Sequence, residues 1–125
     1  MARILLAEDE MPVREFVTRA LVGRGHDVIG VADGAMALEL LAEDDGYDLL
    51  LTDIVMPMVD GIALALKVTK DHPDLRILMM TGYPNQKQRA HNLDLLIHDV
   101  IVKPFTLEEI CRAVDEALGL DRSDR

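Results

Sequence analysis

Five side chains that could do chemistry lie at or just after the ends of short apolar runs in the sequence. They are Glu8, Asp9, Asp53, Thr81 and Lys103. If the runs form parallel strands of one sheet, their carboxyl ends meet at one edge and bring these side chains together. Two carboxylates about 4 Å apart repel each other by roughly 4 kcal/mol at an effective dielectric constant of about 20. Three carboxylates therefore require a cation, and oxygen ligands without His or Cys favour Mg²⁺.

Beside such a cation, the carboxylate of Asp53 can act as a nucleophile toward a phosphoryl group. Lys103 would contact the oxygens of that group by charge, and Thr81 by a hydrogen bond. The product would be an acyl phosphate on Asp53. A single polar residue after a strand is usually a solvated loop residue, so the prediction depends on the full set at corresponding strand ends.

The runs that must position these residues are short and continuously apolar. They cover residues 4–7, 28–31, 49–51, 77–80 and 100–102. None alternates apolar with polar residues, which is typical of strands buried on both faces of a parallel sheet. Each interval between the runs is long enough for one helical crossover. We therefore predict an α/β, doubly wound (βα)5 fold of the flavodoxin-like type, with a five-stranded parallel sheet in the order 2-1-3-4-5. Its ligand crevice would lie between strands 1 and 3.

The segments between the runs show helical spacing of apolar residues. Pro12 suits the first turn of the first predicted helix, the second helix follows Asp33 and Gly34, and the last begins at a capping box of Thr106 and Glu109. The crossover at 83–98 is mostly polar in its first half, which predicts a short or mobile helix. The apolar stripe of the first helix comprises Val13, Phe16, Val17, Ala20 and Leu21.

The third predicted helix, at about 61–70, is apolar nearly all round. Ile62, Ala65 and Leu66 lie on one side of it. Leu64 and Val68 lie on another side, where they form either an exposed contact patch or a surface that the sheet covers. We favour the second interpretation, because a large sheet often covers such a helix more fully than a helical wheel suggests.

Length and charge limit the classes of protein that remain. The 125 residues predict one domain at 1–119 and a short polar tail at 120–125. The 13 Lys and Arg against 23 Asp and Glu give a formal net charge of −10, which disfavours binding to nucleic acid or to a membrane. Cys111 is the only cysteine, so no disulfide can form within the chain. With no signal-peptide pattern at the amino terminus, we expect a cytoplasmic protein.

The ordered motifs resemble the receiver domain (CheY-like) of two-component response regulators. They are Glu8-Asp9, the segment DIVMPMVDG at 53–61, Thr81-Gly82 and Lys103-Pro104. The resemblance implies that Asp53 accepts phosphate from a histidine kinase or a histidine phosphotransfer protein, with Thr81 and Lys103 contacting the phosphoryl group.

The same resemblance implies a Mg²⁺ site and a particular backbone geometry. Asp9 would bind the ion directly, and Glu8 directly or through water. Asp53 and the backbone carbonyl of Val55 would complete the protein ligands. The Lys103-Pro104 peptide bond is expected to be cis, and Asp60 is expected to cap the third helix.

One position departs from the pattern of the family. Receivers usually carry an aromatic residue three positions before the Lys, whereas this chain has Val100 there. Either the fourth crossover itself or the ring of Tyr83 would then carry the signal outward.

The segments 1–9 and 49–57 are similar in particular to the CpdR-type single-domain regulators. That likeness implies a stand-alone regulator that signals by changing its binding to a downstream protein. It connects the chain with cell-cycle control and with an ATP-dependent protease or its substrates. Such a protein is not an enzyme, beyond catalysing its own phosphorylation and dephosphorylation.

Two other functions fit parts of the sequence. A small Mg²⁺-dependent phosphohydrolase would also use Asp53 as nucleophile, but it needs a second acid where this chain has Val55. A flavodoxin-like protein would bind FMN at the same crevice, but the acidic loop 8–12 would repel the flavin phosphate.

Overall fold

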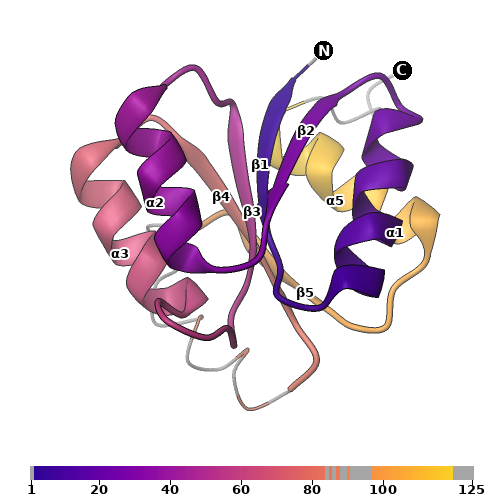
Figure 1. The fold of residues 1–125 in the computed structure, drawn as a ribbon. Coiled ribbons are helices and arrows are strands. Elements are labelled where there is room, and N and C mark those ends of the chain that lie inside the picture. The colour runs from indigo at the N-terminus through magenta and orange to yellow at the C-terminus, as the bar shows by residue number, and fades with distance from the viewer. Residues whose placement is uncertain (1, 84, 86, 88–89, 91–96, 120–125) are drawn as a thin grey trace.

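The computed structural model describes residues 2–83, 85, 87, 90 and 97–119. Its five strands form one parallel sheet in the order β2-β1-β3-β4-β5, as predicted (Figure 1). The strands are β1 (Arg3–Ala7), β2 (Asp27–Val31), β3 (Leu49–Asp53), β4 (Arg76–Thr81) and β5 (Asp99–Val102). The helices are α1 (Met11–Val22), α2 (Gly34–Glu43), α3 (Gly61–Asp71) and α5 (Leu107–Ala117). Most of the crossover between β4 and β5, where a short or mobile helix was predicted, lies outside the described residues, as does the tail at 120–125.

Two separate apolar cores hold the helices against the sheet. On β1, Leu5 and Ala7 belong to the core beneath α2 and α3, whereas Ile4 and Leu6 belong to the core beneath α1 and α5. Figure 1 shows α2 and α3 on one side of the sheet and α1 and α5 on the other. Because the central strands are covered on both faces, their sequences are continuously apolar rather than alternating.

The edge strand β2 departs from the prediction of burial on both faces. Ile29 is 36% exposed and Gly30 is also exposed, whereas Val31 is buried. The reason is its place in the sheet, since β2 pairs only with β1 and lies at an edge of the sheet.

The buried face of α3 also differs from the simple helical wheel. Leu64 and Val68 are fully buried, which confirms that the sheet covers them. Leu66 is 49% exposed and therefore lies away from Ala65, although the wheel grouped them. On α1, Phe16 is 42% exposed and only the later part of the predicted stripe is buried.

Local signals at the helix ends confirm the predicted starts. The Thr106 side chain accepts a hydrogen bond from the Glu109 N–H, and the Glu109 side chain accepts one from the Thr106 N–H, which completes the capping box. Asp60 caps α3 by accepting a hydrogen bond from Ala63 N–H at 2.8 Å. In the part of the chain that the structure describes, no helix is long and apolar enough to cross a membrane.

The two faces of α3 predict different responses to truncation. Leu64→Ala should lower the free energy of unfolding by about 2–5 kcal/mol, because it leaves a cavity in the core beneath α2 and α3. Leu66→Ala removes the same atoms from a half-exposed site and should change it by less than about 1 kcal/mol. Urea denaturation of both variants tests this, and equal losses would contradict the assignment of the buried face.

Candidate functional site

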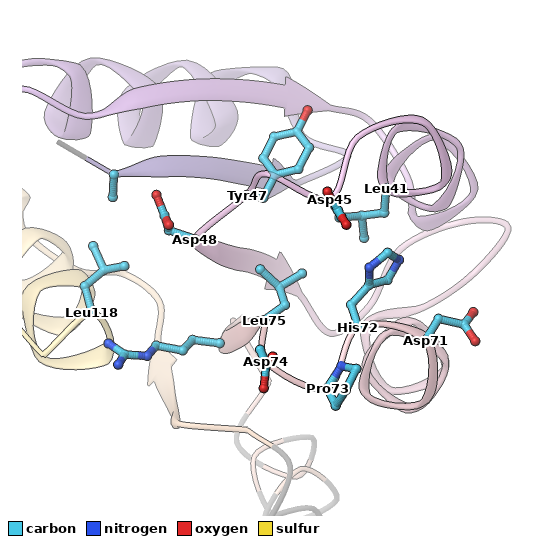
Figure 2. Close-up of a pocket in the computed structure, with 12 residues that line it drawn as sticks. Leu41, Asp45, Tyr47, Asp48, Asp71, His72, Pro73, Asp74, Leu75 and Leu118 are labelled. Atoms are coloured by element: carbon cyan, nitrogen blue, oxygen red, sulfur yellow. The ribbon is translucent and has the colours of Figure 1, made fainter.

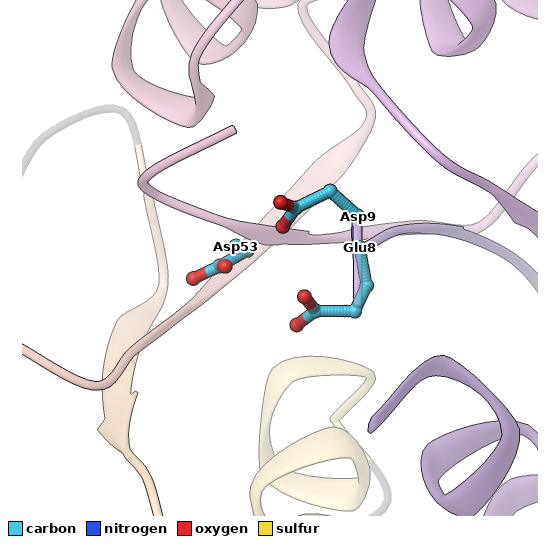
Figure 3. A group of neighbouring side chains, drawn as sticks. All are labelled: Glu8, Asp9 and Asp53. Carbon is cyan, nitrogen blue, oxygen red and sulfur yellow. The ribbon is translucent and has the colours of Figure 1, made fainter. Parts of the chain in front are cut away.

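Three carboxylates gather at the carboxyl ends of two neighbouring strands. Glu8 and Asp9 follow β1, and Asp53 ends β3, which is paired with β1. One carboxylate oxygen from each residue lies within 4.8 Å of the others (Figure 3). Glu8 is fully buried and Asp53 is 6% exposed, whereas Asp9 is exposed. The fold therefore brings together the three acids that the sequence predicted.

Lys103 reaches this cluster from the residue after β5. Its Nζ donates hydrogen bonds to Glu8 Oε1 at 2.8 Å and to Asp53 Oδ2 at 3.2 Å. Glu10 lies further away, with Oε1 at 3.9 Å. The Lys103 N–H donates to the Thr81 carbonyl at 2.7 Å, which fixes the start of the side chain. The Lys103-Pro104 peptide bond is cis, as predicted.

Burial dominates the electrostatics of the cluster. It raises the pKa of the Glu8 carboxyl, although the hydrogen bond from Lys103 acts in the opposite direction. Burial likewise raises the pKa of Asp53 against the attraction of Lys103, and the charge of Asp9 adds to the rise. Burial lowers the pKa of the Lys103 ammonium, but Glu8 and Asp53 outweigh it and the net shift is upward. One ammonium group thus only partly compensates for the removal of these carboxylates from water.

Thr81 ends β4 with its side chain fully buried and turned toward the following residues. Its hydroxyl accepts a hydrogen bond from the Tyr83 N–H at 3.0 Å and donates one to the Tyr83 carbonyl at 3.3 Å. The side chain of Tyr83 is 58% exposed. The hydroxyl therefore holds the first turn of the fourth crossover.

The loop after β3 is held close to Asp53 by Gly61, the first residue of α3. A Cβ at Gly61 would collide with the Asp53 carbonyl and approach the Ile54 Cα to 2.9 Å, so only glycine fits. The Gly61 N–H donates to the Ile54 carbonyl at 2.7 Å, which closes the loop. Val55 lies in this loop with its side chain 43% exposed, and Met58 adopts a positive φ of 70°.

One residue that contacts the cluster, Arg14, was not identified from the sequence. The Arg14 guanidinium donates a hydrogen bond to the Glu8 backbone carbonyl at 2.6 Å. The acceptor is a main-chain atom, so no pattern of side-chain types could predict the contact. The only available signal was the place of a cationic residue in the first turns of the helix that follows the acidic loop.

The donor set suits a hard divalent cation. It consists of carboxylate oxygens from three residues, without His or Cys, and Mg²⁺ prefers oxygen ligands and keeps several waters. Asp9 is exposed, so the cluster is open to such an ion from solvent. Glu8, Asp9 and Asp53 therefore fit Mg²⁺.

A hollow of about 700 Å³ lies at the amino ends of the strands, opposite the carboxylate cluster (Figure 2). It is formed by the connections that lead into β3 and β4 and by the end of α5. Asp48, His72 and Leu118 mark these three sides. The carboxylate cluster is at the carboxyl ends of the strands, so the two features are distinct.

The fold and the site together define a class of protein. Residues 4–115 match the family model of the response regulator receiver domain. The chain belongs to this family and is a two-component signalling protein of the receiver class. Receiver-domain regulators are in general signalling proteins rather than enzymes.

Particular relatives refine this assignment. The chain is 40% identical over 118 residues to the response regulator receiver protein CpdR of Brucella abortus (strain 2308), covering 94% of this chain and 98% of that protein. It is 38% identical over 119 residues to the sensor kinase CckA of the same strain, covering 94% of this chain but 12% of the kinase. These matches confirm the predicted likeness to CpdR-type receivers.

A solved structure is similar over almost the same range. The response regulator TrrA of Thermotoga maritima, in complex with Mg²⁺ and BeF, matches with a TM-score of 0.84 at 29% identity. The alignment covers 94% of this chain and 100% of that chain.

The raised pKa of Asp53 predicts that its charge costs stability. Asp53→Asn should increase the free energy of unfolding by about 1 kcal/mol without divalent cations, because it removes a desolvated charge from the cluster. Urea denaturation in EDTA measures the change. Glu39→Gln, an exposed site on α2, removes the same charge and serves as the control. A less stable Asp53→Asn variant would contradict the prediction.

Proposed function

We propose that this protein is a stand-alone response regulator that accepts a phosphoryl group on Asp53 in a Mg²⁺-dependent reaction. The observation that carries the proposal is the buried Asp53 carboxylate, with Lys103 Nζ at 3.2 Å and two further carboxylates within reach, in a receiver fold. The donor is a phosphohistidine on a histidine kinase or a histidine phosphotransfer protein.

The transfer forms one bond and breaks one. An Asp53 carboxylate oxygen attacks the phosphorus, and the P–N bond of the phosphohistidine breaks. Its electron pair stays on the imidazole nitrogen, which takes up a proton from solvent. Lys103 then moves its hydrogen bond from the Asp53 carboxylate to a phosphoryl oxygen, and Thr81 donates to another.

The metal ligands in this proposal are Glu8, Asp9, Asp53 and the backbone carbonyl of Val55. When bound, Mg²⁺ supplies positive charge beside the reacting oxygens. The role of Glu8 is twofold, because its carboxylate also holds Lys103 at 2.8 Å before the reaction. That contact keeps the ammonium group at the site without leaving it paired to Asp53 alone.

The output starts at Thr81 in this proposal. To donate its one proton to a phosphoryl oxygen, the Thr81 hydroxyl must give up its bond to the Tyr83 carbonyl, and we expect the rotating side chain to leave the Tyr83 N–H as well. The backbone of Tyr83 loses both hydrogen bonds and the first turn of the fourth crossover is released. Val100, 5% exposed and packed in the core beneath α2 and α3, has no ring to move in response. The signal therefore passes through Tyr83 and the crossover.

The downstream partner is a protein that distinguishes the two states of this surface. Similarity to CpdR favours an ATP-dependent protease or its substrates as that partner, and control of the cell cycle as the setting. The formal net charge of −10 disfavours nucleic acid and membranes as partners. We place the protein in the cytoplasm, where a histidine kinase would phosphorylate it.

The phosphoacceptor is tested by intact mass after incubation with acetyl phosphate. Wild-type protein should gain one phosphoryl group when Mg²⁺ is present and none in EDTA, because the crowded carboxylates need the cation before they can approach an anionic donor. Asp53→Asn should gain none, whereas Asp71→Asn, at an exposed residue of α3, should behave as wild type.

Two results would contradict this proposal. One is phosphorylation of Asp53→Asn to the same extent as wild type. The other is steady turnover of p-nitrophenyl phosphate, which would identify a phosphohydrolase instead of a receiver.

The Thr81 pathway is tested by NMR with a beryllofluoride adduct as phosphoryl mimic. In wild type the Tyr83 amide resonance should shift strongly, because it loses its hydroxyl acceptor. Thr81→Val lacks that acceptor already, so the adduct should shift its Tyr83 resonance much less. Thr69→Val, on α3, is the matched control and should respond as wild type. An unchanged Tyr83 resonance in wild type would overturn the proposed route.

A further inference from the structure

Arg14 connects the start of α1 to the acidic loop. Its N–H donates to the Glu10 carbonyl at 2.9 Å, which places Arg14 at the end of the first hydrogen-bonded turn of α1. Its guanidinium turns back along the chain, and Nη1 donates to the Glu8 carbonyl at 2.6 Å. The same short segment is thus held through both the backbone and the side chain of one residue.

The backbone of Glu8 is fixed at both of its polar groups. Its N–H donates to the Val31 carbonyl on β2 at 3.0 Å, and its carbonyl accepts from Arg14. The Glu8 carboxylate also accepts a hydrogen bond from the Glu10 N–H at 3.1 Å. Because the Glu8 carbonyl belongs to the peptide plane that leads to Asp9, the contact with Arg14 sets the direction in which Asp9 leaves the strand.

Gly30 on β2 provides the space for the Arg14 side chain. A Cβ at Gly30 would lie 3.2 Å from both Cγ and Cδ of Arg14, which is closer than ordinary packing allows. The aliphatic part of Arg14 therefore lies across the edge strand at a position without a side chain. The φ angle of Gly30 is not positive, so packing, not backbone conformation, favours glycine here.

We propose that Arg14, seated over Gly30, is a positioning residue that orients Glu8 and Asp9 for binding of the divalent cation. The proposal deepens the proposed function and rests on it, because it assigns a role toward the same cation. Arg14 acts through the backbone of Glu8 and has no contact with the reacting groups in this role.

The charge of Arg14 allows this role to be distinguished from simple electrostatics. A guanidinium near a cation site repels the cation, so electrostatics alone predicts that removing the charge tightens Mg²⁺ binding. Loss of orientation predicts the opposite, because partners that orient metal ligands are typically worth 10–100-fold in affinity. The two interpretations therefore differ in sign.

The test is a titration of the full chain with Mg²⁺ alone, followed by NMR shifts of the Asp9 and Asp53 amides. Arg14→Met keeps most of the aliphatic stem over Gly30 but lacks the donor, and it should bind Mg²⁺ about tenfold more weakly. Arg14→Lys restores a donor and should recover part of the affinity. Arg19→Met is the matched control, since Arg19 is an exposed residue of α1 that borders the same shallow hollow as Gly30. It should bind as tightly as wild type or slightly more tightly.

A second variant tests the same contact from the other strand. Gly30→Ala should weaken Mg²⁺ binding while leaving the arginine in the sequence, because its Cβ would lie 3.2 Å from Cγ and Cδ of Arg14 and shift the stem away from β2. The free energy of unfolding is measured alongside, and the loss of affinity should remain at temperatures where each variant is fully folded. If Arg14→Met does not fold, Gly30→Ala decides the question.

The outcomes separate the two levels of the argument. Wild-type affinity in both Arg14→Met and Gly30→Ala would overturn the role of Arg14 and leave the proposed function intact. Tighter binding in Arg14→Met would show an electrostatic effect only and would also overturn it. Absence of Mg²⁺ binding to the wild type would instead overturn the metal dependence in the proposed function.

Discussion

The ammonium group of Lys103 is the interaction on which the site depends. It lies at hydrogen-bond distance from one carboxylate that is fully buried and another that is nearly so. Charges removed from water in this way are tolerated only with a partner of opposite sign. The three residues come from the ends of β1, β3 and β5, so the strand order that brings those ends together is also what makes their burial possible.

Much of the site follows from this arrangement and was therefore predictable. Continuous apolar runs specify strands covered on both faces, and parallel strands in the order 2-1-3-4-5 place their carboxyl ends at one edge. From the sequence alone, Glu8, Asp9, Asp53 and Lys103 could be assigned to a common cluster, because Asp53 ends its strand and the others follow theirs by one or two residues. The capping residues Asp60 and Thr106 were predictable because capping is local: each side chain accepts a hydrogen bond from an N–H three residues further along the chain.

The features that sequence reasoning missed depend on distances across the fold. Arg14 contacts a main-chain oxygen, and every residue has one, so the residue types alone do not indicate which oxygen is the acceptor. The face that α3 buries depends on how the helix lies on the sheet, so a helical wheel grouped Leu66 with the wrong neighbours. The exposure of β2 depends on its place at the edge of the sheet. Its run of residues does not alternate apolar with polar, so the sequence gives no sign that one face is exposed.

The separation of the two apolar cores has a consequence for how such a protein can diversify. No buried side chain is shared between the core beneath α2 and α3 and the core beneath α1 and α5, among the residues that the structure describes. The backbone of the sheet is their common boundary. Mutations that repack one core can accumulate without requiring compensation in the other. Natural selection can therefore reshape the outer surface of one helical layer for a new partner while the opposite layer keeps the surface that an older partner requires.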